Sequence, residues 1–136
     1  MINIESINES LADAGIRTGL EYAAFQNYGY KGLYGGLNAQ GIHKHKGLKK
    51  SQKILDHMGS TELAANLFRA TQTDEKIRRD HVKDKDTANL THYTVGKAVR
   101  QTIKDLGGTM PEDLPTPDKS IKQIEREQRK KLVKDE

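Results

Sequence analysis

Apolar residues recur three or four positions apart along most of this chain, and they nowhere alternate with polar residues over a useful length. The first spacing is that of one face of an α-helix, whereas alternation is typical of a β-strand. The clearest stretch is residues 87–106, where Val95, Val99 and Ile103 share one face and Gly107 follows as a helix-ending residue. The spacing predicts an all-α fold, a small helical domain of about five helices.

Capping residues indicate where the other predicted helices begin. Thr18-Gly19-Leu20-Glu21 matches a capping box, in which the hydroxyl and the carboxylate each satisfy a backbone N–H of the first turn. Ser60 follows Gly59 and is the expected cap of a helix toward Asp80. The helices expected before residue 87 are therefore 3–14, 18–28, 50–57 and 60–80.

Prolines divide the C-terminal part from the rest. Residues 111–117 hold all three prolines of the chain, and each proline biases the residue before it away from a helix. Thr116 as cap and Pro117 as first helical residue then predict a last, charged helix. We expect a helical domain over residues 1–110, a Pro-rich linker over 111–117 and a C-terminal helix over 118–136.

Composition excludes several classes of protein. The chain has no Cys, so it has no disulfide, no thiolate metal site and no Cys nucleophile. No apolar stretch approaches the roughly 18 residues of a membrane span, and residues 1–5 do not begin a signal peptide. Only about a fifth of the residues are Leu, Ile, Val or Phe, so the core is expected to be small. A cytoplasmic protein without a membrane partner is the expectation.

Positive charge is concentrated in one segment. From Tyr22 to Leu55 there is no Asp or Glu, but there are six lysines, and six of the twelve glycines lie between Gly29 and Gly47. This predicts a glycine-rich basic loop with short helical turns, whose field attracts phosphates or an acidic protein face. The alternative is that the lysines only keep this loop soluble. The candidate contact residues are Tyr30, Lys31, Tyr34, Lys44, Lys46, Lys49, Lys50 and Lys53.

Aromatic residues in the same segment are assigned two roles. Tyr22, Phe25 and Tyr28 have helix-face spacing, so packing is the favoured role for them. Tyr30 and Tyr34 lie among glycines and are the better candidates for stacking on bases of single-stranded nucleic acid.

No motif predicts catalysis. His43-Lys44-His45 has two imidazoles but lies in a lysine run without a carboxylate, which disfavours a metal ion. The glycines of residues 29–36 match no nucleotide-binding motif. Residues 50–57 and the helix from Ser60 have helix-turn-helix lengths, but two packed core helices are favoured because the second offers few donors for bases. The sequence predicts neither enzyme nor cofactor nor metal.

Three segments carry a family resemblance. They are residues 25–37 (FQNYGYKGLYGGL), 46–73 (KGLKKSQKILDHMGSTELAANLFRATQT) and 107–117 (GGTMPEDLPTP). In this order they closely resemble the DNA-damage-inducible protein D (DinD) family, over roughly residues 10–128. The resemblance is to the C-terminal half of that family, without the BRO/KilA-type domain with which members usually begin.

The resemblance implies a bacterial or phage protein of the SOS response that binds rather than catalyses, inhibiting or disassembling RecA-type filaments. The implied partner is a RecA-type recombinase or another bacterial protein. Two alternatives stay open: a direct binder of single-stranded DNA, and a phage- or plasmid-encoded antirepressor or anti-defence inhibitor of a host protein. The narrow apolar stripes of the first and last helices also allow a homo-oligomer.

Overall fold

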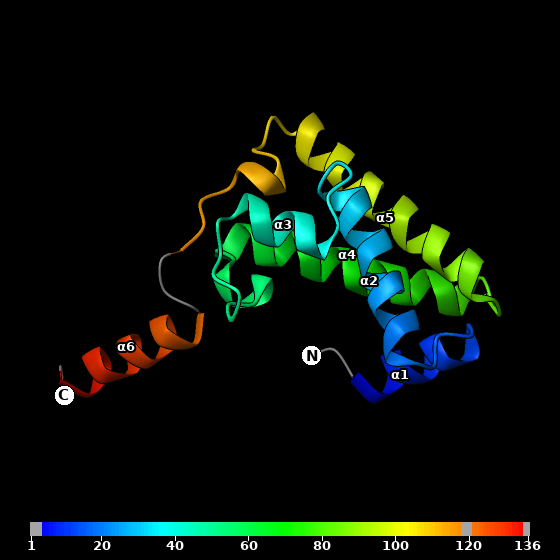
Figure 1. Cartoon of the computed structure of the whole chain (residues 1–136), viewed down its shortest axis with the longest axis horizontal. Helices are drawn as coiled ribbons and strands as arrows, with labels where there is room; N and C mark the ends of the chain where they lie inside the picture. Colours follow the sequence, from blue (N-terminus) through cyan, green and yellow to red (C-terminus); the bar gives the residue numbers. More distant parts are fainter. Residues whose placement is uncertain (1–3, 118–120, 135–136) are drawn as a thin grey trace.

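The computed structural model describes residues 4–117 and 121–134, and within these ranges it confirms the all-α prediction (Figure 1). No strand occurs in the described part of the chain. Two short 3-10 turns accompany the helices, η1 (Ile54–His57) and η2 (Pro111–Asp113). The α-helices are α1 (Ile4–Asp13), α2 (Gly19–Leu33), α3 (Ala39–His45), α4 (Ser60–Arg79), α5 (Lys85–Asp105) and α6 (Ile121–Lys134).

Helix α2 does not end at Gly29, as predicted, but continues to Leu33. The reason is its close packing on α5, the most extensive contact between two helices of the described chain. A Cβ atom on Gly29 would lie 2.2 Å from the His92 ring, and one on Gly32 would lie 2.3 Å from the Tyr93 carbonyl oxygen. A Cβ atom on Gly96 of α5 would likewise lie 2.7 Å from the Gly29 carbonyl oxygen. These positions require glycine although they lie within helices, because only a hydrogen atom fits between α2 and α5 there.

Two apolar clusters form the core, one on each side of this contact. The first lies where α1 packs between α2 and α4, and it includes Leu11, Phe25 and Ile77. The second gathers Tyr30, Leu33, Tyr34, Ile42, Met58 and Val99 beneath α3 and η1. In the first predicted helix, residues 3–14, Leu11 and Ala14 are buried, whereas the side chains of Ile4 and Ile7 lie outside the described residues.

Local signals placed most helix ends correctly. The capping box is present in full: Glu21 N–H donates to Thr18 Oγ1 at 3.1 Å, and Thr18 N–H donates to Glu21 Oε1 at 3.1 Å. Gly107 has φ 74° and ends α5. The predicted helix 50–57 is wrong, because only the η1 turn forms there, and Gly59 rather than Ser60 occupies the cap of α4.

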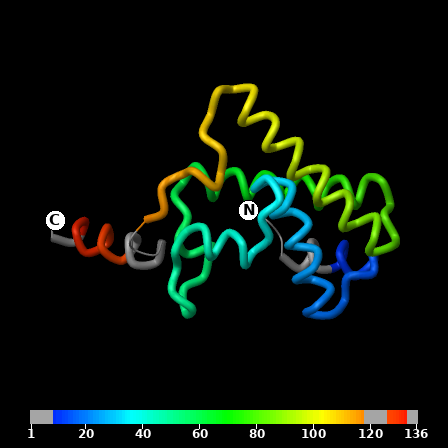
Figure 2. Tube along the Cα trace, turned by 45° about the horizontal axis from the view of Figure 1, so that its top comes forward, coloured from blue at the N-terminus to red at the C-terminus, as the bar shows by residue number. Residues whose placement is uncertain are grey.

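After α5 the C-terminal segment runs along one end of the helical body (Figure 1). Pro111 is buried, and residues 114–117 continue as an extended strap to the side of η1, near which α6 lies (Figure 1). The predicted start of the last helix at residue 118 lies outside the described residues. Figure 2 shows that α1 and the turn at residues 46–53 occupy opposite ends of the helical body. None of the described helices is long and apolar enough to cross a membrane.

Candidate anion-binding surface

Four lysines form an exposed cluster around α3 and η1. Lys44 lies on α3, Lys49 and Lys50 lie in the turn that follows, and Lys53 precedes η1. All four are exposed, and none forms an ion pair with a carboxylate of the described chain. We call these four residues the lysine cluster. Their ammonium groups are available to an anion from outside the molecule.

The turn that carries the lysine cluster is held by hydrogen bonds. His43 Nε2 lies 3.0 Å from both the Lys49 and the Gln52 carbonyl oxygens, so this nitrogen carries the proton and donates to them. Lys49 N–H donates to Gln52 Oε1 at 2.7 Å. Gly47, with φ 67°, ends α3 and turns the chain toward Lys49. The ammonium groups therefore project from an ordered backbone, which lowers the entropy cost of binding.

Lys46 is not part of this exposed surface, contrary to the prediction. Its ammonium lies 2.6 Å from Glu62 Oε1, and the two side chains are 4% and 0% exposed. It also donates to the His57 carbonyl oxygen at 3.3 Å and to Thr116 Oγ1 at 3.4 Å. Lys46 is thus an internal tie between the lysine-bearing turn, α4 and the strap. Its sequence position among solvent-facing lysines gave no sign of this partner.

Tyr30 and Tyr34 are also misplaced by the prediction, because both are buried, at 6% and 1% exposure. Tyr34 Oη donates to Glu62 Oε2, and burial together with this hydrogen bond raises the pKa of Tyr34. Tyr30 packs edge-on against Tyr34, with ring centroids 6.1 Å apart. Neither ring can stack on a base. Lys31 is exposed on α2 and lies over the Tyr28 ring, apart from the lysine cluster.

A buried row of polar side chains continues from Glu62 along α4. Asn66 Nδ2 donates to Tyr34 Oη at 2.9 Å, and Arg69 Nη2 donates to Asn66 Oδ1 at 3.2 Å. The Arg69 guanidinium carbon lies 4.9 Å from the centre of the Tyr30 ring. This cation–π contact partly replaces the carboxylate that a buried guanidinium usually has.

His92 of α5 ends this polar row. It is 1% exposed and stacks near Phe25, with centroids 4.2 Å apart. His92 Nδ1–H donates to the Phe25 carbonyl oxygen at 2.8 Å, so Nε2 accepts from Arg69 Nη1. Burial and then the Arg69 charge lower the pKa of His92 to about 3. The imidazole is therefore neutral at physiological pH.

The segment made of η2 and the strap is held at both ends. Arg100 donates to both carboxylate oxygens of Glu112, at 2.7 and 2.9 Å, and also to the Leu33 carbonyl oxygen at 3.1 Å. The bond to Glu112 raises the pKa of Arg100, so this bidentate pair persists across physiological pH. Near the other end, His57 Nδ1 lies 3.4 Å from the Pro117 carbonyl oxygen. The strap thus closes over the buried Lys46.

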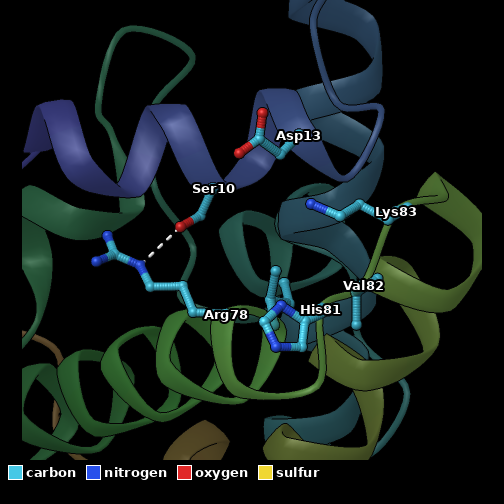
Figure 3. Close-up of a pocket in the computed structure, with 7 residues that line it drawn as sticks. Ser10, Asp13, Arg78, His81, Val82 and Lys83 are labelled. Atoms are coloured by element: carbon cyan, nitrogen blue, oxygen red, sulfur yellow. Dashed lines mark hydrogen bonds between the residues drawn. The ribbon is translucent and has the colours of Figure 1, made fainter.

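A cavity of about 170 Å³ between α1 and the end of α4 holds further ionisable residues (Figure 3). Ser10 Oγ accepts the Nε–H of Arg78 at 2.7 Å, while Asp13, His81 and Lys83 line other walls. The Ser10 hydroxyl thus accepts a hydrogen bond from a cationic guanidinium. A base that could activate it as a nucleophile would instead accept its proton. No group of three or more metal-ligating side chains occurs among the residues that the structure describes.

Comparison with known proteins assigns the family. The model of the DinD C-terminal domain matches residues 2–124. The chain belongs to this family. It is 67% identical, over 117 residues, to the DNA damage-inducible protein D of Escherichia coli (strain K12). That alignment covers 86% of this chain and 43% of the E. coli protein, so the chain spans less than half the length of this relative. No solved structure matches it.

Proposed function

We propose that this DinD C-terminal domain is a non-enzymatic interaction module of the bacterial DNA-damage response, which inhibits or disassembles RecA-type filaments. The lysine cluster is the contact surface in this proposal. Family membership and the name of the E. coli relative support the process. The observation that carries the contact is a set of four exposed lysines, on α3 and in the hydrogen-bonded turn after it, whose ammonium groups form no ion pair with the residues that the structure describes.

The physical basis is attraction to a polyanion. A filament on single-stranded DNA contains the phosphates of its bound strand, and a clustered positive field favours encounter with these phosphates or with an acidic face of the recombinase. Lys46 and its partner Glu62 cancel each other inside the molecule, so the external charge comes from Lys44, Lys49, Lys50 and Lys53. Binding of this kind weakens as salt screens the charges.

Charge reversal tests the contact surface. The double variant Lys49→Glu/Lys50→Glu should lose inhibition of recombinase strand exchange by at least about tenfold, because two attractions become repulsions. The control Lys97→Glu/Lys104→Glu makes the same change of net charge on exposed positions of α5, and it should inhibit like the unaltered chain. Full inhibition by the first variant would remove the lysine cluster from the mechanism.

A second candidate is direct binding of single-stranded DNA, which the same unpaired lysines favour. Four lysines on phosphates predict a slope of log K against log salt near −3, from about −0.7 per contact. Because Tyr30 and Tyr34 are buried, this binding would depend on phosphates without stacking on those rings. Titration of labelled oligonucleotide without recombinase measures that slope. Binding to the recombinase alone, in nuclease-treated solution, supports the protein contact instead.

A further inference from the structure

Helix α6 carries a second group of exposed cations. The side chains of residues 126–132 are all exposed, and four of these seven residues are Arg or Lys. Arg126, Arg129 and Lys130 are three and four positions apart, so they share one face of the helix. None of the three forms an ion pair with a carboxylate in the parts of the chain that the structure describes. We call these three residues the α6 cations.

The beginning of α6 lies next to the lysine cluster. Helix α6 contacts η1, and Lys53 of the cluster directly precedes η1. From there α6 points away from the helical body (Figure 1). At 1.5 Å per residue, Arg126 and Lys130 lie about 8 and 14 Å along the helix axis from its first residue, Ile121. The two groups of cations therefore follow one another along a line.

Few carboxylates interrupt this line. Asp56 is the only acidic residue between Lys44 and Ser60, and Glu127 is the only one among residues 126–132. Successive residues of a helix are about 100° apart, which places Glu127 beside the face of the α6 cations and not within it. The lysine cluster and the α6 cations together make seven cations against these two carboxylates.

A line of cations fits a polymer of phosphates better than a folded protein. The buried centre of a protein interface is depleted of charged residues, so seven exposed cations are unusual there. Proteins that bind single-stranded nucleic acid without sequence preference instead have a positively charged surface that follows the strand. The guanidinium groups of Arg126 and Arg129 also match phosphate oxygens, to which they can donate two parallel hydrogen bonds.

We infer that α6 extends the lysine cluster into one track for a single strand of nucleic acid, with the α6 cations on phosphates beyond those that the cluster holds. The inference rests on the proposed function, of which it lengthens the contact with DNA. The strand passes from Lys49 and Lys50 over η1 and then along α6. Seven phosphate contacts instead of four change the expected slope of log K against log salt from near −3 to near −5, at about −0.7 per contact.

A salt titration of the full chain tests the inference. The probe is a labelled oligothymidylate of about 16 nucleotides, the upper end of the site sizes of small single-strand-binding domains. The unaltered chain should show a slope near −5. The variant Arg126→Gln/Arg129→Gln/Lys130→Gln should show a slope near −3 and bind at least about tenfold more weakly at about 50 mM salt. Glutamine has a helix propensity similar to those of Arg and Lys, and circular dichroism checks that the helix content is unchanged.

Two further variants are controls for charge and for position. Lys31→Gln/Lys97→Gln/Lys104→Gln removes the same charge from exposed positions of α2 and α5, and it should keep the slope near −5. Arg126→Lys/Arg129→Lys keeps the charge of α6 and should also keep the slope. Loss of slope in either control would overturn the inference, because the effect would then not belong to the charge on this face of α6.

The outcomes separate this inference from the proposed function. A slope near −3 that the triple variant of α6 leaves unchanged would overturn the inference and leave the lysine cluster as the whole contact. Absence of binding to the oligonucleotide would overturn the inference together with direct DNA binding, whereas the contact with the recombinase is measured independently in nuclease-treated solution. An oligoglutamate peptide of equal charge that competes as strongly as the oligonucleotide would also overturn it, since an acidic protein face would then suffice.

Discussion

Glycine has different roles in the α2–α5 contact and in the turn after α3, residues 46–53, which carries most of the lysine cluster and is called the basic turn below. Gly29 and Gly32 have ordinary helical backbones, and a Cβ atom on either would overlap α5. Gly47 has φ 67°, and nothing lies within 4 Å of the position where its Cβ would be. In the first region glycine permits close packing, and in the second it permits a change of chain direction.

The difference shows how rigidity is distributed over the molecule. Around α2 and α5 the backbones themselves are in contact, so the positions of these helices are fixed by sterics. The basic turn, in contrast, is attached to the body mainly by polar bonds, chief among them the buried pair of Lys46 and Glu62. The first region should thus be sensitive to volume, and the second to the loss of a charge.

The largest expected effect is on the basic turn. Lys46→Met leaves the Glu62 carboxylate buried without its cation, and it should lower the free energy of unfolding by about 3–5 kcal/mol. Urea denaturation followed by circular dichroism measures this change. Lys46→Met/Glu62→Gln removes both charges and should recover a large part of the loss. Two equally unstable variants would show that the pair does not act as a unit.

The next effect tests close packing. Gly32→Ala places a methyl group 2.3 Å from the Tyr93 carbonyl oxygen, which is backbone and cannot rotate away. Overpacking of this kind should cost about 2–3 kcal/mol, measured by the same denaturation. Gly19→Ala is the matched control, because nothing lies within 4 Å of that Cβ. A Gly32→Ala variant as stable as the control would mean that the α2–α5 contact is looser than described.

These two regions also explain what could be predicted from the sequence. The capping box at Thr18, the span of α4 and α5 and the glycine end at Gly107 depend on neighbours in the chain, and they were predicted correctly. The continuation of α2 past Gly29 depends on His92, 63 residues away in the numbering, and could not be inferred from local pattern.

The candidate site also contains residues that local pattern placed correctly and residues whose position depends on distant partners. Lys44, Lys49, Lys50 and Lys53 are exposed as the run of charge indicated, and their role in binding stays a prediction. Lys46 and Tyr34 are buried instead of exposed, because both bond to Glu62. A single sequence does not show that Glu62 lies next to them.

The third prediction concerns pH and the α2–α5 contact, where His92 fills the space beside Gly29. The pKa of His92 is about 3 in the folded chain, against about 6.5 when unfolded. The unfolded chain therefore takes up this proton first, so the stabilisation is complete above pH 6.5 and is lost as the pH falls toward 3. Between pH 8 and pH 5 the free energy of unfolding should fall by about 2 kcal/mol.

A pH series of urea denaturations measures this slope, and His92→Asn is the variant that isolates it. The variant is expected to be less stable at every pH, but nearly flat between pH 8 and pH 5. Glu21, Asp80 and Asp84 have pKa values below their usual range and do not titrate in that window. A slope that persists in His92→Asn would place its origin elsewhere.

The smallest expected effect on stability concerns the end of α4, where His81 occupies the position that glycine occupies at the end of α5. Helix α4 ends with the Val82 N–H donating to the Ile77 carbonyl oxygen, and His81 at the turn has φ 52°. Helix α5 ends in the same way, with Gly107 in the equivalent place. Because a side chain disfavours this conformation, His81→Gly should raise the free energy of unfolding by about 1 kcal/mol, and Gly107→His should lower it by a similar amount. If His81→Gly is destabilising instead, the imidazole that lines the cavity in Figure 3 makes a favourable contact that outweighs its backbone cost.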